Sequence, residues 1–503
     1  MISFSVSMVL LLAGYWVYGR YVEKVFGIEP GRLTPAVARP DGVDYIPLSG
    51  WRLFLIQFLN IAGLGPIFGA IMGAKFGSSA YLWIVFGCIF AGAVHDYFSG
   101  MLSLRNNGES YPEIVGRYMG KPFMQVVRVF TPVMMVLVGA VFVAGPAGLL
   151  AKLTAGTVGF SFGIWTAVIF IYFIAATLLP IDQLIGRLYP LFAAALLFMA
   201  FGILVSLYLH MPALPEVTDG LMNTHPKAET TPLFPMLFIT IACGALSGFH
   251  ATQSPMMARC MTNERQGRPV FYGAMIAEGI VALIWAAAAN FAFHTPEGQA
   301  FFTGGNAAQV VDFVSNNWLG TLGGALAVLG VIAAPITSGD TAFRSARLIV
   351  ADALKIEQKS LMKRLLVSLP LFAAGFVLLF IDFEVIWRYF AWSNQILGTI
   401  TLWAVTIYLT VNRKNYFIGL IPALFMTAVV SAYLFIAPET LALSATVSYA
   451  LALALTALCV FFFVRWKNRL TGKAVPSTAD GSVTARRPQR AVRLAPFRPG
   501  AFG

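Results

Sequence analysis

Charged residues are scarce in this sequence of 503 residues. They make up 11% of the chain, whereas apolar residues make up 58%. Soluble domains carry roughly 25% charged and 45–50% apolar residues, so this composition excludes an ordinary soluble protein. The apolar residues form long continuous runs rather than short alternating segments, which favours membrane helices over a β-barrel. The sequence therefore predicts an all-α polytopic membrane protein.

Cysteines and catalytic motifs are also scarce. The four cysteines, Cys88, Cys243, Cys260 and Cys459, lie in or beside apolar runs without the spacing of metal ligands. This pattern indicates neither a disulfide framework nor a metal site. The sequence contains no H-E-x-x-H motif, no P-loop and no plausible Ser-His-Asp grouping, which argues against a hydrolase and an ATP-driven pump. We expect a protein that is not an enzyme and that uses no cofactor.

The apolar runs give a first count of the membrane crossings. A bilayer core requires about 20 apolar residues for each helical crossing, and runs of that length predict about 13 spans, to within one. Their approximate limits are 2–19, 53–74, 79–104, 124–151, 160–180, 187–210, 232–250, 270–293, 319–340, 365–381, 389–411, 414–436 and 441–465.

Most of the positive charge falls on one side of these predicted spans. The net charge is +12, from 34 Lys and Arg residues against 22 Asp and Glu residues. With the C-terminus placed in the cytoplasm, only Lys75, Lys152, Lys227 and Arg388 fall outside. Positive residues concentrate on the cytoplasmic side of membrane proteins, so this asymmetry predicts an outside N-terminus and a cytoplasmic C-terminus. The basic charge then reflects topology, and we expect no nucleic-acid partner.

The predicted spans divide the chain into four regions. Residues 1–52 comprise the first span and a cytoplasmic connection rich in Pro and Gly, and residues 53–411 form the core. Residues 412–471 add accessory spans. Residues 472–503 form a basic tail that we expect to be disordered. No long segment outside the membrane remains to house a soluble catalytic domain, so function must lie between the helices.

Four polar interruptions break the apolar runs. They are Asn60 to Gly69, Cys243 to Pro255, Ala334 to Arg347, and Trp387 to Gly398, the last of which we interpret as a loop entering a span. Glycine lowers the cost of non-helical backbone, and Pro66 cannot donate a backbone hydrogen bond. Irregular backbone at membrane depth is tolerated only where protein buries it or where it lines a wet cavity. The broken helices near 60–69 and 243–255 therefore predict a binding cavity.

The first two breaks lie five spans apart, so their spans cross in opposite directions. That spacing is expected of an inverted repeat with five spans in each half and one broken helix per half. A half-helix N-terminus presents free N–H groups and a positive dipole end, which suit a carboxylate. The alternative for Gly63 and Gly65 is close helix packing. The predicted substrate contacts are Asn60, Ala62, Gly63, Gly65, Pro66, Gly244, Ser247, Gly248, His250, Ser393, Asn394 and Gln395.

Ionisable groups at membrane depth are rare and usually functional. Glu278 stands in an apolar run without a basic neighbour; it either exchanges a proton or is a neutral structural acid. For Asp96 there are two alternative roles, ion coupling and an ion pair with Arg105 or Arg344. His95 lies beside Asp96, and His250 contacts a proton or the substrate unless it is a satisfied interfacial histidine. The predicted ion-coupling residues are Asp96, Glu278, Thr337, Ser338 and Asp340.

Asp340 and its neighbours leave two further questions open. Asp340 is followed by Arg344 and Arg347, so helix capping or an ion pair is an alternative to the coupling role. The hydroxyl groups of Thr337 and Ser338 are suitable ligands for Na⁺. The sequence therefore leaves H⁺ and Na⁺ as alternative coupling cations.

Several stretches resemble the carbon starvation protein A (CstA) family, in the family's order and over most of residues 50–400. They are "NIAGLGPIFGAIMGAKFG", "AGAVHDYFSGMLSLRNNGES", "FPMLFITIACGALSGFHA", "TSGDTAFRSARLIVADAL" and "SNQILG". The resemblance implies a secondary transporter of the inner membrane that takes up peptides or pyruvate during carbon starvation. It also implies a core similar to the LeuT-type fold of the amino acid–polyamine–organocation superfamily.

The sequence departs from the family pattern at the edge of the first break. Gln57, Phe58 and Leu59 stand where longer members of the family have histidines, and His95 stands where a glutamine is expected. The chain is also shorter than the long members. These differences leave the substrate open, because residues at the edge of a pocket determine specificity.

Together, these observations predict a symporter for a small carboxylate-bearing nutrient or peptide, coupled to H⁺, with rocking halves around a central site. The alternatives are a Na⁺-coupled carboxylate or amino-acid symporter and a membrane nutrient sensor that does not transport. A membrane-embedded enzyme and a passive channel are further rivals. The expected partners are the substrate and the lipid bilayer, and the sequence does not indicate an oligomeric state.

Overall fold

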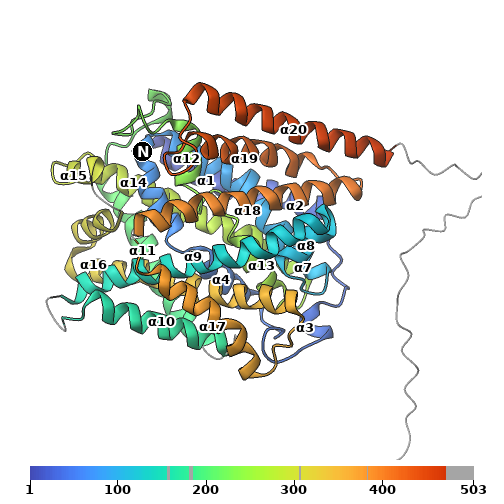
Figure 1. The fold of residues 1–503 in the computed structure, drawn as a ribbon. Helices are drawn as coiled ribbons and strands as arrows, with labels where there is room; N and C mark the ends of the chain where they lie inside the picture. Colours follow the sequence, from blue (N-terminus) through green and yellow to red (C-terminus); the bar gives the residue numbers. More distant parts are fainter. Residues whose placement is uncertain (156–158, 180–184, 305–306, 382, 472–503) are drawn as a thin grey trace, which may run out of the picture. The chain divides into compact units, whose positions relative to one another are not determined.

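The computed structural model describes residues 1–155, 159–179, 185–304, 307–381 and 383–471, and within these ranges it contains helices and no strand (Figure 1). The chain divides into two units, Met1–Val460 and Phe461–Gly503. The first unit holds the helical core. In the second unit the structure describes the last turns of one helix, and the predicted basic tail, 472–503, lies outside the described residues.

Short 3₁₀ and π segments, labelled η, are interspersed with the α-helices along the chain. In chain order the elements are α1 (Ile2–Trp16), α2 (Tyr18–Phe26), α3 (Pro35–Ala38), α4 (Gly50–Ile61), η1 (Gly65–Gly69), α5 (Ala70–Gly73), η2 (Ala74–Phe76), α6 (Ser79–Leu82), η3 (Trp83–Gly92), α7 (Ala93–Arg105), α8 (Tyr111–Met119), α9 (Lys121–Thr154), α10 (Phe162–Leu178), α11 (Ile185–His210), η4 (Val217–Asp219), α12 (Leu233–Thr240), α13 (His250–Ala258), η5 (Glu264–Gln266), η6 (Arg268–Gly273), α14 (Ala274–Phe293), α15 (Gln299–Thr303), α16 (Ala307–Leu354), α17 (Leu361–Leu378), α18 (Phe383–Val411), α19 (Phe417–Ile436) and α20 (Ala445–Thr471).

The described residues form ten helices that are long and apolar enough to cross a membrane, or up to eleven if one bent pair counts as a span. The protein is therefore a multi-span membrane protein, but the predicted count of 13 is not confirmed. Two predicted spans account for the difference. The run 160–180 forms α10, which has only 17 residues, and the run 232–250 is divided between α12 and α13.

The first broken span bends within the stretch 60–69. Its two parts, Gly50–Ile61 and Gly65–Phe76, meet at an angle of 56°. Ala62 leaves the helical region with φ −77° and ψ 56°, and the helix resumes at Gly65. Pro66 follows at once, where the missing N–H of proline does no harm because the first turn of a helix has no acceptor for it.

The second broken span opens into irregular backbone between Thr240 and His250. The chain leaves the helix at Ile241, and Gly244 adopts a left-handed conformation with φ +89°. A residue with a Cβ avoids this region, so glycine is required at this position. The helix resumes as α13 with His250 as its first residue.

The third and fourth predicted interruptions are wrong. Helix α16 runs through 334–347 without a break, and α18 runs through Trp387–Gly398, so the predicted loop at that position is helical. The hydroxyl groups of Thr337 and Ser338 donate to the carbonyl of Ala334, one turn earlier, which is compatible with a continuous helix. The distortion in α16 lies instead at Gly320, with φ +64°.

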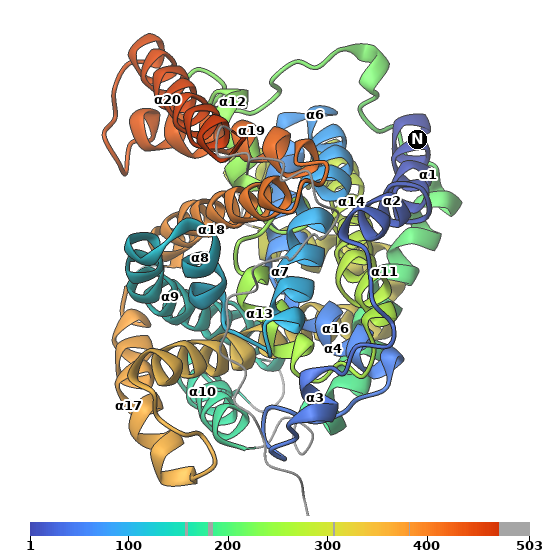
Figure 2. The ribbon, with the colours of Figure 1, turned by 90° about the vertical axis from the view of Figure 1, so that its right-hand side faces the viewer.

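The broken spans lie among packed helices. Helix α7 packs against α13, and α16 packs against both α9 and α11. Figure 2 shows α7 and α13 side by side in the middle of the first unit, with α9, α10 and α17 on one side and α1, α2 and α11 on the other. Helix α13, which begins at the second break, is therefore surrounded by protein. Each of its residues is buried.

Candidate functional site

The two broken spans meet at their breaks. A Cβ placed on Gly65 would overlap the side chain of Cys243, and a Cβ on Gly244 would lie 3.5 Å from the Cα of Pro66. Close approach of two backbones therefore requires glycine at Gly65 as well as at Gly244. Close packing, the alternative interpretation of Gly65, is what the structure shows there. It also brings both irregular segments to one place.

Gly63 faces a different neighbour. A Cβ at this position would lie 2.9 Å from both the ring of Phe142 and the hydroxyl oxygen of Ser338. Ala62 and Pro66 are buried as well. The first break thus contacts the second break on one side and α16 on the other.

Two histidines and two carboxylates form a buried chain beside the second break, which we call the carboxylate–histidine chain. Helix α7 supplies His95 and Asp96, α13 supplies His250, and α14 supplies Glu278. His95 Nδ1 lies 2.8 Å from Asp96 Oδ1, and His250 Nδ1 lies 2.9 Å from Asp96 Oδ2. His250 Nε2 lies 3.5 Å from Glu278 Oε2. All four side chains are fully buried.

This geometry argues against the alternative role of Asp96, an ion pair with Arg105 or Arg344. The structure pairs Asp96 with two histidines, whereas Arg105 donates to Glu264 at 2.9 and 3.0 Å, and Arg344 lies 3.2 Å from Asp44. Glu278 lacks a basic neighbour in the sequence, but the fold places His250 beside it.

Several atoms of the carboxylate–histidine chain have no hydrogen-bond partner among the described residues. They are His95 Nε2, His250 Nε2 and both carboxylate oxygens of Glu278. Buried polar atoms in native proteins are normally paired, so unpaired ones suggest a bound ion, water or ligand. The thiol of Cys243 lies within 4.8 Å of ligand atoms of His250 and Glu278, which makes these three residues possible holders of a metal ion.

Asn394 of α18 fixes the shape of the second break. Its side-chain oxygen accepts from the N–H of Phe249 at 2.6 Å, and its Nδ2 lies 3.1 Å from Ser247 Oγ. Its backbone carbonyl accepts from the N–H of Gly248 at 3.2 Å. The N–H of Gly248 is therefore already engaged and is not free to bind a carboxylate. Asn394 acts on the site through the backbone that it holds.

The neighbours of Asn394 lie differently. Gln395 donates to the carbonyl of Phe238 at 2.8 Å, while its own side-chain oxygen is buried with no partner among the described residues. Ser393 is 9% exposed.

A second buried acid, Asp340, is bound by two tyrosines. Tyr172 of α10 donates to Asp340 Oδ2 at 2.8 Å, and Tyr189 of α11 lies 3.0 Å from Oδ1. The same Tyr189 hydroxyl lies 3.1 Å from Asn60 Oδ1 at the end of α4. The alternative role of Asp340, an ion pair with Arg344 or Arg347, is not what the structure shows, because both arginines bind Asp44 instead.

Oxygen atoms from α4 and α16 gather next to Asp340, and we call them the oxygen cluster. Thr337 Oγ1 lies 2.9 Å from the carbonyl of Leu59 and 2.7 Å from that of Ala334. Ser338 Oγ lies 3.2 Å from the same two carbonyls. Two carbonyls and two hydroxyls in one place are hard oxygen ligands of the type that alkali and alkaline-earth cations prefer.

A cluster around Asp44 joins the connection before α4 to the C-terminal half of α16, and we call it the Asp44 cluster. Arg344 and Arg347 contact the Asp44 carboxylate at 3.2 and 3.3 Å, and all three side chains are buried. Burial alone would raise the pKa of Asp44, but the positive charges of Arg347, Arg344 and Arg259 outweigh it and hold the pKa below its usual value. Removal of one partner from such a buried pair is strongly destabilising.

Three of the contributing residues, Tyr172, Tyr189 and Cys243, are not predicted as site residues from the sequence. The tyrosines come from α10 and α11, and no periodicity in the sequence tells which distant helix approaches Asp340. For Cys243 the available signal is its place in the second break, next to Gly244.

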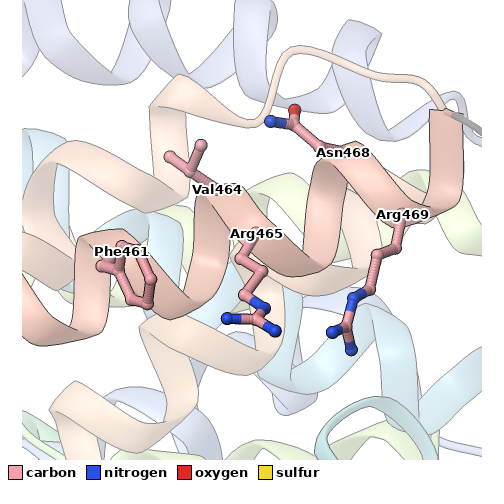
Figure 3. A pocket seen from close by; sticks show the side chains of 5 residues that line it. All are labelled: Phe461, Val464, Arg465, Asn468 and Arg469. Atoms are coloured by element: carbon pink, nitrogen blue, oxygen red, sulfur yellow. The ribbon is translucent and has the colours of Figure 1, made fainter.

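The last turns of α20 in the second unit carry a surface hollow. Figure 3 shows its lining residues, Phe461, Val464, Arg465, Asn468 and Arg469, along this single helix. A surface formed by one helix does not enclose a ligand on several sides, as small-molecule sites do.

Comparison with known proteins supplies a family and a fold. The family model described as carbon starvation protein CstA matches residues 1–159, 151–320 and 289–432. A membrane protein of Haemophilus influenzae is 44% identical over 344 residues, which cover 59% of this chain and 92% of that protein.

Two relatives from Escherichia coli carry functional names. The pyruvate/proton symporter BtsT is 30% identical over 361 residues, covering 58% of this chain and 50% of BtsT. The peptide transporter CstA is 31% identical over 341 residues, covering 55% of this chain and 48% of that protein. The matched region thus spans about half the length of these two transporters.

Two solved structures share the fold at low sequence identity. MhsT in complex with L-phenylalanine has a TM-score of 0.57 at 12% identity, covering 82% of this chain and 99% of MhsT. A manganese transporter of Eremococcus coleocola has a TM-score of 0.53 at 12% identity, covering 86% of this chain and 99% of that protein. The helical fold of the described residues is therefore similar to the fold of these two proteins.

Proposed function

The chain belongs to the carbon starvation protein CstA family, and on this basis we propose that it is a secondary active transporter of the bacterial inner membrane, an H⁺-coupled symporter that imports pyruvate or small peptides during carbon starvation. The names of the relatives support the substrate class, and the fold shared with transporters supports the mode of action. A transporter, rather than an enzyme, also agrees with the absence of catalytic motifs from the sequence.

The observation that carries the proposal is the buried carboxylate–histidine chain at the second break. Glu278 and Asp96 lie on either side of His250, so a proton can pass between α14 and α7 through the imidazole ring. Both carboxylates are fully buried beside irregular backbone. Ionisable groups inside a membrane protein cost free energy and are usually retained for a function. Proton relay is a common function of such groups.

The substrate carboxylate docks, in this proposal, where the breaks meet. The backbone N–H groups of Leu64 and Gly65 and those around Gly244 supply the donors, because the N–H of Gly248 is engaged with Asn394 and the N–H of Gly63 donates to the carbonyl of Ile61 at 2.8 Å. The two halves then rock around this place, so that the site faces each side of the membrane in turn.

A second coupling ion, Na⁺, is favoured by the oxygen cluster. Its hydroxyl and carbonyl oxygens suit a hard cation, and Asp340 supplies a negative charge on the same helix. The two candidate ions predict that different substitutions abolish coupling. Loss of H⁺ coupling follows from Glu278→Gln, and loss of Na⁺ coupling follows from Thr337→Ala combined with Ser338→Ala.

The deciding experiment is uptake by proteoliposomes that contain the purified chain. Labelled pyruvate and labelled dialanine are offered separately, and a proton gradient or a sodium gradient is imposed alone. The proposal predicts accumulation of one compound driven by the proton gradient. Accumulation driven by sodium alone supports the second candidate, and no accumulation under either gradient contradicts the proposed function.

The variant Glu278→Gln tests the mechanism in the same assay. We expect it to abolish gradient-driven accumulation but to retain exchange of labelled for unlabelled substrate, since exchange needs no net proton movement. Asp312→Asn is the matched control, because Asp312 is an exposed acid on α16 that accepts from Asn316. Full accumulation by Glu278→Gln would remove Glu278 from the mechanism.

A further inference from the structure

Three side chains of metal-ligating type converge at the second break, and the spacing of these residues along the sequence does not reveal the convergence. Cys243 lies in the irregular segment, His250 begins α13, and Glu278 lies on α14. One ligand atom from each lies within 4.8 Å of the others, and all three residues are buried. The thiol of Cys243 has weak neighbours, Ser247 Oγ at 3.4 Å and Asn394 Nδ2 at 3.9 Å.

The hydrogen bonds of His250 leave one ring nitrogen available. Its Nδ1 is engaged by Asp96 at 2.9 Å, and Asp96 is engaged in turn by His95 at 2.8 Å. A carboxylate on one ring nitrogen orients the imidazole and increases the basicity of the other nitrogen, as it does for histidines that bind zinc. The other nitrogen, Nε2, is buried and has no hydrogen-bond partner in the described part of the chain.

Glu278 offers a carboxylate that faces this ring nitrogen. Both of its oxygens are buried without a hydrogen-bond partner in the described ranges, and Oε2 lies 3.5 Å from His250 Nε2. Two ligands of a tetrahedral zinc ion, each about 2.0–2.2 Å from the metal, lie about 3.3–3.6 Å apart. The observed separation therefore suits two ligands of one ion.

The chemistry of the three donors selects the metal. One sulfur, one imidazole nitrogen and one carboxylate oxygen match zinc and its neighbours, whereas Mg²⁺ and Ca²⁺ prefer oxygen ligands alone. A thiolate and a carboxylate together carry two negative charges, so a divalent ion would balance the charge of the three ligands. This balance matters at this depth because an uncompensated charge inside a membrane protein is costly.

We propose that Cys243, His250 and Glu278 bind a divalent transition metal of the zinc class, with a fourth position left open. The ion joins the irregular segment before α13 to α14 and occupies the atoms that face each other in the carboxylate–histidine chain. Bound metal therefore excludes a proton from His250 Nε2 and holds the second break in one conformation. The site stands on its geometry and does not depend on the proposed transport function.

The test uses the purified full-length chain, stripped with a chelator and then titrated with Co²⁺, which reports thiolate ligation through a charge-transfer band in the near ultraviolet. Zn²⁺ is added afterwards to displace the Co²⁺, and bound metal is counted by elemental analysis. The matched control is Cys88→Ser, because Cys88 is also buried and beside α14 but bonds the carbonyl of Met275. We expect the wild type and Cys88→Ser to bind one ion per chain with the thiolate band.

The ligand variants give the discriminating result. Cys243→Ser removes the thiolate band, and Cys243→Ser and Glu278→Gln each weaken Zn²⁺ binding at least about 100-fold, since loss of even a supporting group in a zinc site costs about 10–100-fold in affinity. Thermal unfolding without metal checks that each variant is folded. The absence of stoichiometric binding by the wild type, or equal binding by Cys243→Ser, overturns the proposal. Uptake without metal is measured separately, so failure of this site leaves the proposed transport untouched.

Discussion

Asn394 shows how one side chain determines the shape of a membrane site. It holds the backbone of the second break through Phe249 and Gly248 and also lies beside Ser247. The sequence indicates Asn394 as a contact to the substrate, whereas the structure engages its polar atoms with the protein. Its importance therefore follows from the irregular backbone that it satisfies.

Asn394→Ala is expected to impair both stability and transport. The change leaves the buried N–H of Phe249 without its acceptor, and an orphaned buried donor costs about 1–3 kcal/mol. We expect a lower midpoint of thermal unfolding and little remaining uptake in proteoliposomes. Thr410→Ala on the same helix is the control, because its hydroxyl bonds only the carbonyl of Thr406. A midpoint of thermal unfolding for Asn394→Ala equal to that of the wild type would contradict the role of Asn394 in holding the second break.

His225 predicts a pH dependence of stability. It lies in the connection between α11 and α12, where its ring contacts Phe76 at 4.9 Å between centroids. Burial, together with the positive charges of Lys75 and Lys227, lowers its pKa from 6.5 to about 4. Because the unfolded chain then binds more protons than the folded one, stability is complete above about pH 6.5 and declines as the pH falls towards 4.

The measurement compares wild type with His225→Gln, which cannot take up a proton at this position. We expect the midpoint of thermal unfolding of the wild type to fall more steeply between pH 6.5 and 4.5 than that of the variant. Hydrogen exchange in residues 211–232 should accelerate over the same range. Parallel profiles for the two proteins would show that His225 does not contribute.

The pairings of the buried acids mark the limit of sequence reasoning at the residue scale. The sequence indicates that Asp96, Glu278 and Asp340 are unusual, because charged residues in apolar runs are rare. For Asp96 and Asp340 it offers nearby arginines as alternative partners, and for Glu278 it offers no basic partner. The actual partners, His250 for Asp96 and Tyr172 and Tyr189 for Asp340, come from other helices, and pairing across the bundle is set by packing rather than by spacing.

At the scale of elements, glycine and proline are reliable signals when they stand together. The run Gly-Leu-Gly-Pro coincides with the bend after α4, and Gly244 coincides with the irregular segment after α12. The stretch Thr-Ser-Gly-Asp at Thr337 has a similar composition, yet α16 continues through it. Although Pro335 lies two residues before Thr337, the hydroxyl groups of Thr337 and Ser338 bond the preceding turn there, and the helix continues.

Gly65→Ala tests whether the two breaks must touch. A methyl group at this position overlaps Cys243, and forced overpacking costs about 1–3 kcal/mol. We expect lower thermal stability and loss of uptake. Gly148→Ala in α9 is the matched control, because a Cβ there meets nothing within 4 Å, and it should be neutral or stabilising by up to about 1 kcal/mol. Equal behaviour of the two variants would mean that the contact is dispensable.

At the scale of the whole molecule, this chain and its longer relatives share a matched region but differ in length. The chain belongs to a family whose Escherichia coli members are about twice as long as the matched region, while it covers 92% of the Haemophilus influenzae relative. The fold class follows from the sequence because long apolar runs permit few architectures. The number of spans does not follow, since α10 is short and α12 and α13 divide one run.

The orientation proposed from the charge asymmetry is tested with reporter fusions. Green fluorescent protein placed after residue 471 should fluoresce, because it folds in the cytoplasm. Alkaline phosphatase inserted in the connection 211–232 should be active, because that connection, with Lys227, is predicted to lie outside. The reverse pattern would contradict the predicted topology.

Helix α16 carries both the hydroxyl groups of the oxygen cluster and the arginines of the Asp44 cluster. Thr337 and Arg347 are ten residues apart on an unbroken stretch, which corresponds to about 15 Å along the axis. A cation that prefers one tilt of α16 therefore changes the free energy of the Asp44 cluster. By thermodynamic reciprocity, the Asp44 cluster changes the affinity for that cation by the same factor. A substitution at Asp44 is thus expected to change the affinity of the oxygen cluster for that cation, although Asp44 does not belong to that cluster.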